Sequence, residues 1–208
     1  SQEVKPYPQN LPQTSKDIHL NLIDYNCDKN YRLAITDSKG NMYLKDMQYR
    51  PLPGWNPKNL QHPFAITPFH IRVNKDYFVS LQTNGTLHVL NRQSNTYPKF
   101  PIPTGEVVYN ALVVKKGNDA IDTHIIFLTK TGTLYTYNLE GTLQNKLALD
   151  KNEYTVCFYL SPEMKNKQQY ALLRQDIDKI SVLDEHRKLL FEKEIETTQP
   201  IIFQYYLF

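Results

Sequence analysis

Short apolar runs separated by polar turns make up this chain, and no apolar period of 3.6 residues persists over a useful length. The runs occur in pairs, and the two members of a pair are joined by turns such as Asn84-Gly85 or Thr131-Gly132. Glycine adopts a positive φ at little steric cost, so these joints are typical of β-hairpins. The pattern therefore predicts an all-β protein built from hairpins.

The hairpin pattern returns along the chain at a nearly constant spacing of 45, 47 and 46 residues. The turn residues that precede the second strands are Gly40, Gly85, Gly132 and Asp178. Each second strand ends in Asp or Asn, whose side chain accepts hydrogen bonds from the following backbone amides; these residues are Asp46, Asn91, Asn138 and Asp184. A second aligned column precedes the turns and contains Tyr31, Tyr77, His124 and Tyr170. A repeat of this length is the signature of β-propeller blades.

We therefore predict a β-propeller with about four visible four-stranded blades. The blades are expected at about residues 17–60, 63–105, 107–150 and 153–197. The outer strands of the first two blades are predicted at residues 51–55 and 97–101, which are rich in proline. Proline cannot donate a hydrogen bond to a ladder, so it belongs on an edge strand.

Both ends of the chain resemble parts of further blades. Residues 1–16 are expected to form the outer strand of a preceding blade, because residues 7–12 resemble residues 97–101, and residues 198–208 are expected to form the first strand of a next blade. Two interpretations stay open: a piece of a larger propeller, which we favour, and a small ring closed by pairing of its ends. An open blade edge predicts self-association or binding of a second protein chain.

The composition is that of a domain with an ordinary hydrophobic core, with 208 residues of which 40% are hydrophobic and 22% charged. The net charge of +3 is too small to indicate a nucleic-acid-binding surface. The chain contains no stretch of 18 apolar residues, so no transmembrane span is predicted. The two cysteines, Cys27 and Cys157, have no spacing that indicates a disulfide framework.

One loop carries a candidate metal site. Side chains with oxygen atoms stand at alternate positions, as in calcium loops that gather hard ligands around one ion; they are Asp24, Asn26, Asp28 and Asn30. Against this, Lys29 stands where such loops usually have glycine, and Ile35 stands where a bidentate acid would close the site. The alternative is that these residues only shape a turn between two strands. Calcium is therefore the one cofactor candidate.

No constellation of residues in the sequence indicates catalysis, and we expect a protein that is not an enzyme. The histidines are scattered without metal-ligand spacing, and the chain has neither a Gly-x-Ser-x-Gly elbow nor a glycine-rich phosphate loop. Many aromatic side chains recur in columns of the repeat, which indicates packing between blades before ligand stacking.

The repeats resemble blades of bacterial propellers of the PQQ-like and FG-GAP-like types. The resemblance is carried by residues 24–35, 40–44 and 52–55, and it is best over residues 17–105. It implies an extracytoplasmic setting, in the periplasm or on the cell surface, and protein partners. It does not imply the quinone cofactor, because quinoprotein blades carry a tryptophan motif in nearly every repeat whereas this chain has one tryptophan, Trp55.

Two hypotheses about function follow. The first is a non-catalytic scaffold of the bacterial cell envelope that binds proteins through its loops and blade surfaces. The second is an enzyme or glycan-binding propeller whose site lies at the central channel and is completed by blades outside this sequence. Several Asp, Glu, Arg or His side chains converging at the inner strands would favour the second hypothesis, whereas an apolar lining would favour the first.

Overall fold

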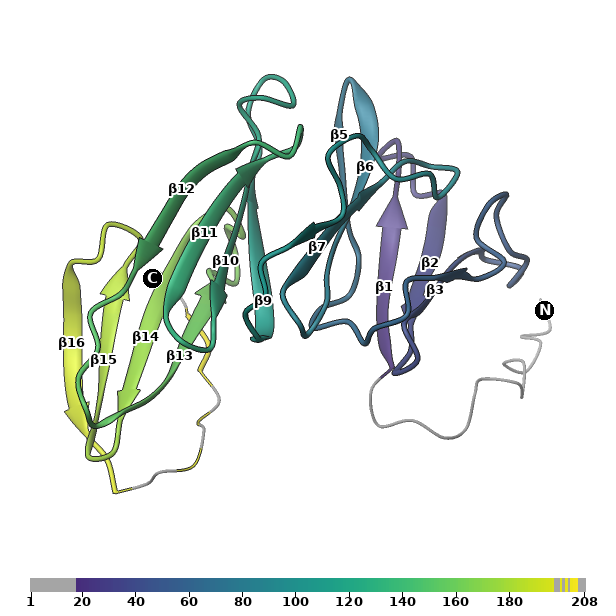
Figure 1. Ribbon diagram of the computed structural model, residues 1–208. Helices are drawn as coiled ribbons and strands as arrows, with labels where there is room; N and C mark the ends of the chain where they lie inside the picture. The colour runs from purple at the N-terminus through teal and green to yellow at the C-terminus, as the bar shows by residue number, and fades with distance from the viewer. Residues whose placement is uncertain (1–17, 197–198, 200, 202, 206–208) are drawn as a thin grey trace, which may run out of the picture.

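The computed structural model describes residues 18–196, 199, 201 and 203–205, and over these residues the protein consists of four four-stranded antiparallel sheets with no helix. Each sheet is built from four strands that are consecutive in the chain. Figure 1 shows the sheets side by side in chain order, from blade 1 on the right to blade 4 on the left. The predicted all-β propeller architecture is confirmed.

The first two blades have short outer strands. Blade 1 contains β1 (His19–Asp24), β2 (Tyr31–Thr36), β3 (Asn41–Asp46) and β4 (Lys58–Asn59). Blade 2 contains β5 (Phe69–Val73), β6 (Lys75–Leu81), β7 (Thr86–Leu90) and β8 (Ile102–Pro103).

The last two blades have outer strands of full length. Blade 3 contains β9 (Val108–Lys115), β10 (His124–Thr129), β11 (Thr133–Asn138) and β12 (Leu143–Ala148). Blade 4 contains β13 (Thr155–Pro162), β14 (Tyr170–Asp176), β15 (Lys179–Asp184) and β16 (Leu189–Glu194). The predicted outer strand of a preceding blade, residues 1–16, lies outside the described residues.

The repeated glycine has two physical causes. Gly40 and Gly85 both have a φ of +78°, a conformation that side chains with a Cβ rarely adopt. In addition, a Cβ on Gly40 would lie 2.6 Å from the backbone nitrogen of His62, in the connection to the next blade, and a Cβ on Gly85 would collide with the backbone carbonyl of Glu106. Glycine therefore allows the hairpin turn and also leaves space for the backbone that leads into the following blade.

The prediction of outer strands at residues 51–55 and 97–101 is wrong. These segments touch the third strand only at their start, through the isolated bridges Lys45–Pro51 and Leu90–Thr96 and the hydrogen bond from the Leu52 N–H to the Leu44 carbonyl oxygen. The paired outer strands start further along, at β4 and β8. Trp55 and Phe100 turn inward instead, with exposed fractions of 0% and 9%. Prolines remove ladder donors, and burying two large aromatic rings stabilises the fold more than a few edge hydrogen bonds would.

The predicted tyrosine column does not form one structural position. In the ladders, Asp46 lies opposite Arg32 rather than Tyr31, and Asp184 lies opposite Ala171 rather than Tyr170, whereas Asn138 does lie opposite His124. Side chains alternate between the two faces of a strand, so a shift of one residue moves a side chain to the other face. The glycine column is therefore the better guide to the register of the blades.

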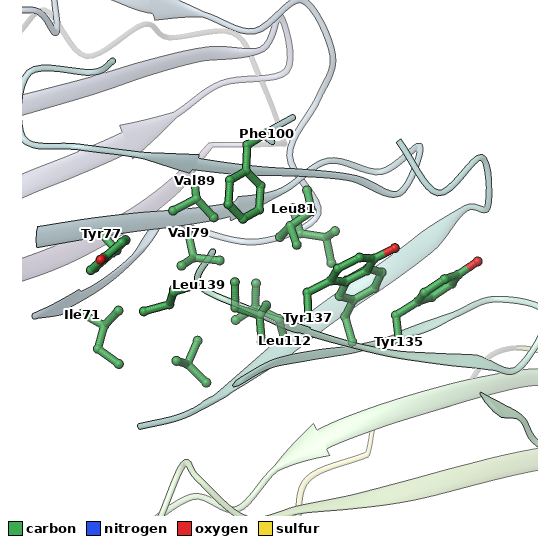
Figure 2. Close-up of a cluster of buried hydrophobic side chains, with 14 of the residues drawn as sticks. Ile71, Tyr77, Val79, Leu81, Val89, Phe100, Leu112, Tyr135, Tyr137 and Leu139 are labelled. Atoms are coloured by element: carbon green, nitrogen blue, oxygen red, sulfur yellow. The ribbon is translucent and has the colours of Figure 1, made fainter. Parts of the chain in front are cut away.

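Apolar clusters between neighbouring blades form the core. One cluster joins blades 1 and 2 around Trp55 and Phe78, a second joins blades 2 and 3, and a third joins blades 3 and 4 around Phe158 and Leu172. Figure 2 shows the second cluster, in which Val79 and Leu81 of blade 2 and Leu112 of blade 3 lie in the same buried group. The middle blades thus bury both of their faces.

Trp55 offers a test of this packing. The side chain is fully buried, its Nε1 donates a hydrogen bond to the Arg92 carbonyl oxygen at 2.6 Å, and its ring centroid lies 5.1 Å from that of Phe78. We expect Trp55→Ala to lower the free energy of unfolding by about 3–5 kcal/mol, because it leaves a cavity between blades 1 and 2. Trp55→Phe should cost less, since it keeps most of the ring volume.

The measurement is urea unfolding followed by circular dichroism. Leu143→Ala is the control, because Leu143 is 46% exposed on an outer strand and should change the free energy of unfolding by less than about 1 kcal/mol. Equal losses for Trp55→Ala and Leu143→Ala would contradict the assignment of Trp55 to an inter-blade core.

Candidate functional site

The inner strands of the four blades surround a hollow of about 620 Å³. It receives Asn21 from β1, Phe69 from β5, Leu112 and Val114 from β9, and Leu160 from β13. Phe203 of the C-terminal segment adds a further apolar wall. The hollow therefore occupies the place at which a propeller has its central channel, and its walls are mainly apolar.

Two ionisable side chains, Glu163 and Lys167, belong to the described lining. Glu163 is only 1% exposed, and its carboxylate accepts hydrogen bonds from the backbone N–H groups of Lys165 (2.8 Å) and Asn166. These bonds shape the loop between β13 and β14. The Glu163 carboxylate thus holds the backbone of this loop beside the hollow.

The loop predicted to bind calcium lies between β1 and β2, and its side-chain oxygen atoms accept hydrogen bonds from other groups of the protein. The carboxylate of Asp24 accepts hydrogen bonds from the backbone N–H groups of Asp28 (3.1 Å) and Lys29 (2.9 Å). Burial acts to raise the pKa of Asp24, but these backbone hydrogen bonds outweigh it and lower that pKa. Asp28 Oδ1 in turn accepts a hydrogen bond from the backbone N–H of Asn30 at 2.9 Å.

The two asparagines of this loop accept hydrogen bonds from arginines. Arg32 donates to Asn30 Oδ1 at 2.6 Å, and Arg72 of blade 2 donates to Asn26 Oδ1 at 2.7 Å. The loop therefore links blade 1 to blade 2. Within the described part of the chain, no three His, Cys, Asp or Glu side chains form a group that could hold a metal ion. The structure supports the turn-shaping role, and calcium binding stays a prediction.

Calcium binding by this loop has a direct test. Binding requires that calcium raise the midpoint of thermal unfolding of the full chain. Asp24→Asn should abolish the rise, because asparagine still accepts backbone hydrogen bonds but lacks the charge that a divalent cation needs. Differential scanning calorimetry with calcium and with chelator measures the effect, and an unchanged midpoint in the wild-type chain would contradict the prediction.

A second polar cluster, which sequence analysis did not find, lies between blades 1 and 2. Asp76 Oδ1 lies 2.9 Å from His70 Nε2, and its Oδ2 lies 2.6 Å from Arg92 Nε. The guanidinium carbon of Arg92 lies 4.4 Å from the centroid of the Tyr25 ring. Burial lowers the pKa of His70, although the hydrogen bond with Asp76 acts to raise it.

This cluster joins the two blades. The side chains of His70 and Asp76 are only 8% and 11% exposed. Their pairing is visible in retrospect from the sequence, because His70 and Asp76 flank the tight β5–β6 turn at Asn74, whose φ is +61°. A hairpin that short brings side chains six residues apart into contact.

A third cluster surrounds Glu106, just before β9. Its Oε2 accepts hydrogen bonds from three hydroxyl groups at 2.7 to 3.0 Å; the donors are Thr129, Thr131 and Thr133. Its Oε1 accepts a fourth from the Tyr135 hydroxyl at 2.7 Å. Burial acts to raise the pKa of Glu106, but the four hydrogen bonds outweigh it and lower that pKa to about 2. The start of blade 3 is thereby fastened to its own hairpin.

Glu106→Gln should lower the free energy of unfolding at neutral pH by about 1–2 kcal/mol, since the hydroxyl groups lose a charged acceptor. The folded pKa lies below the ordinary value of 4.5, so the contribution of Glu106 is present above about pH 4.5 and is lost as the pH falls toward 2. The difference between wild type and variant in urea unfolding should therefore shrink between pH 7 and pH 3. Glu153→Gln, at an exposed position, is the matched control.

Comparison with known proteins agrees with the fold. No family model and no curated protein matches the chain. Among solved structures, BBS1N in complex with ARL6DN is similar with a TM-score of 0.52 and 15% identity, covering 86% of this chain and 53% of that one. BamB from Moraxella catarrhalis is similar with a TM-score of 0.53 and 12% identity, covering 84% and 52%.

The computationally designed Ika8 protein is also similar, with a TM-score of 0.51 and 14% identity over 84% of this chain and 48% of that one. The chain thus spans about half the length of each of these structures. At such identities the likeness shows the fold alone, and it agrees with the strand topology in defining the protein as a β-propeller. Within the described residues, no helix is long and apolar enough to cross a membrane.

Proposed function

We propose that this protein is a non-catalytic scaffold that binds other proteins through an open blade face. The observation that carries the proposal is the face of blade 1 that points away from blade 2. Leu20 and Leu22 of β1 lie on it with exposed fractions of 50% and 52%. Leu33 and Ile35 of β2 stand directly opposite them in the ladder; Leu33 is partly buried and Ile35 is already covered, with an exposed fraction of 3%.

The equivalent face of blade 3 is covered by another blade. In blade 1, Leu20 stands opposite Ile35, which stands opposite Tyr43. In blade 3, the corresponding row consists of residues 112, 127 and 135, namely Leu, Phe and Tyr in the same order across the sheet. That row is 8%, 0% and 3% exposed, because blade 2 packs against it.

The equivalence indicates the kind of partner. A face with this pattern packs, elsewhere in the same molecule, against the apolar face of a second antiparallel sheet. We therefore propose that the blade 1 face binds an apolar β-sheet surface of a partner chain. Exposed leucines on a flat sheet are an unfavourable arrangement in water, and their burial drives association.

The central hollow supports a binding role rather than a catalytic one. Its walls are mainly apolar, and Glu163, one of the two ionisable side chains of the described lining, is engaged by backbone amides. An enzyme or glycan site at the inner strands would require acids, bases or hydrogen-bonding groups that point into the hollow together. The hydrogen-bonding side chains of the described lining are Asn21, Thr67, Ser161, Glu163 and Lys167, and the apolar residues outnumber them.

The cellular setting and the size of the ring are further parts of the proposal. The resemblance of the repeats to PQQ-like blades, together with the structural likeness to BamB, supports an extracytoplasmic scaffold of the bacterial envelope. The chain covers about half of two propellers of known structure, which is consistent with blades that belong to a larger ring. An apolar sheet could cover the leucines of the blade 1 face whether it belonged to such a ring or to a partner protein.

Self-association of the chain tests the open face. We expect the wild-type chain to associate in a concentration-dependent manner in light scattering coupled to size exclusion. Leu22→Lys should weaken the association roughly thirtyfold, since it removes about 2 kcal/mol of apolar burial from the contact. Ile121→Lys, at a position 54% exposed on blade 3, is the control and should leave association unchanged.

A wild-type chain that stays monomeric up to its solubility limit would contradict self-association through this face. Equal weakening by Leu22→Lys and Ile121→Lys would show that added charge, rather than the blade 1 face, decides the result.

A further inference from the structure

The central hollow has the size and the walls of a site for a small apolar molecule. Its volume of about 620 Å³ lies within the range of roughly 300–1,000 Å³ that is typical of ligand pockets. Leu112 and Val114 of β9 and Leu160 of β13 line it with buried apolar side chains, and the ring of Phe69 in the same wall is partly exposed. An apolar molecule that enters the hollow releases water from these walls, which favours binding.

The polar groups of the described wall are few, and most of them are already engaged. Ser161 Oγ accepts a hydrogen bond from the N–H of Tyr205 at 3.1 Å, and Glu163 is held by the backbone amides of its own loop. Asn21 Nδ2 donates a hydrogen bond of 3.4 Å to a backbone carbonyl oxygen, and Thr67 adds one hydroxyl group. A sugar would lose more hydrogen bonds to water than these groups return, so the wall suits an acyl chain better.

One edge of the hollow carries positive charge. Lys167, in the loop between β13 and β14, belongs to the lining and is exposed. Lys116 is also exposed and lies beside this loop, because its backbone N–H donates a hydrogen bond to Gln168 Oε1 at 3.1 Å. The acid of the neighbouring β15–β16 turn, Glu185, is paired with Lys115 at 2.6 Å. Within the part of the chain that the structure describes, the ammonium groups of Lys116 and Lys167 form no ion pair.

Apolar and charged groups meet on the same loop at this edge. Met164 lines the hollow three residues before Lys167, and its side chain is 43% exposed. Methionine is flexible and adapts to the shape of an apolar molecule. The edge therefore offers one apolar and one cationic side chain to a ligand that enters the hollow.

We propose that the central hollow binds a long-chain fatty acid. Its acyl chain lies against the apolar walls, and its carboxylate lies at the edge beside Lys167, where Lys116 adds to the positive potential. The complementary charge favours an anionic amphiphile over a neutral apolar molecule. The hollow lies at the inner strands, so this site goes beyond the function proposed for the blade 1 face and does not depend on it.

The test uses the full chain and cis-parinaric acid, a fatty acid that becomes fluorescent in an apolar environment. We expect saturable binding of one molecule per chain, with displacement by dodecanoate. Decanoate should bind about tenfold more weakly than dodecanoate, because it buries two methylene groups fewer. The absence of saturable binding of the probe would overturn the proposal.

The role of the charged edge is tested by reversing one charge. Lys167→Glu should weaken dodecanoate binding about fivefold at low ionic strength and less at high salt, while binding of the neutral dodecanol stays unchanged. Lys151→Glu is the matched control, because Lys151 is exposed and lies before β13, at the other end of that strand from Lys167. Equal weakening by Lys167→Glu and Lys151→Glu would overturn the placement of the carboxylate.

The position of the acyl chain is tested by filling the hollow. Ala111→Phe adds a ring to the wall and should weaken binding of dodecanoate and dodecanol at least tenfold. Leu22→Lys changes the blade 1 face and should leave both affinities unchanged, so failure of this proposal and failure of the proposed function are distinguishable. Wild-type affinity of Ala111→Phe, or lost binding in Leu22→Lys, would overturn the proposal.

A substitution on the exposed loop serves if circular dichroism shows that Ala111→Phe does not fold. Met164→Asp places a negative charge beside the expected carboxylate and should weaken dodecanoate binding at least tenfold. Unchanged binding by this variant would overturn the proposal as well.

Discussion

Packing of one apolar blade face against the next is the interaction on which the whole structure depends. Each sheet is only four strands wide and carries apolar side chains on both faces, so it cannot exclude water by itself. The two middle blades meet this requirement because each has a neighbour on either side. In blade 3 the row of Leu112, Phe127 and Tyr135 is almost fully buried, whereas the same row of side chains in blade 1 includes a leucine that is half exposed.

The two ends of the array meet the same requirement in different ways. At blade 4, Ile201, Phe203 and Tyr205 of the same chain pack against the outer face, and the buried Gln175 donates a hydrogen bond to the Gln199 carbonyl oxygen. At blade 1, Leu20 and Leu22 face solvent. Both surfaces therefore have the chemistry of a blade interface, and this is the physical reason for proposing that the protein binds other proteins. Neither surface requires a reactive group.

Several polar and charged residues that could have belonged to a binding or catalytic site instead link neighbouring blades or turns. Asn26 reaches Arg72 across blades 1 and 2, and Asp76 holds His70 and Arg92 at the same interface. Glu106 fastens the start of blade 3 to its hairpin through four hydroxyl groups. In each case a polar or charged group is partly removed from water and must find a partner, and the nearest partners belong to the neighbouring blade or turn.

The β-propeller fold, the spacing of the hairpins and the need for glycine at three of their turns could be predicted from the sequence, because these follow from local backbone geometry and from an alternation that repeats four times. The prediction misplaced the outer strands of blades 1 and 2, since the inward turn of Trp55 depends on the shape of blade 2. It also placed Tyr31 and His124 in one column, although a single-residue shift separates them in the ladders.

Other features depend on the tertiary structure alone. They are the partners of Asp24, Glu106 and Gln175, the lining of the central hollow and the cover of blade 4. These features join residues from different blades or from distant parts of the chain, and their geometry depends on how the sheets stack, which no local pattern encodes.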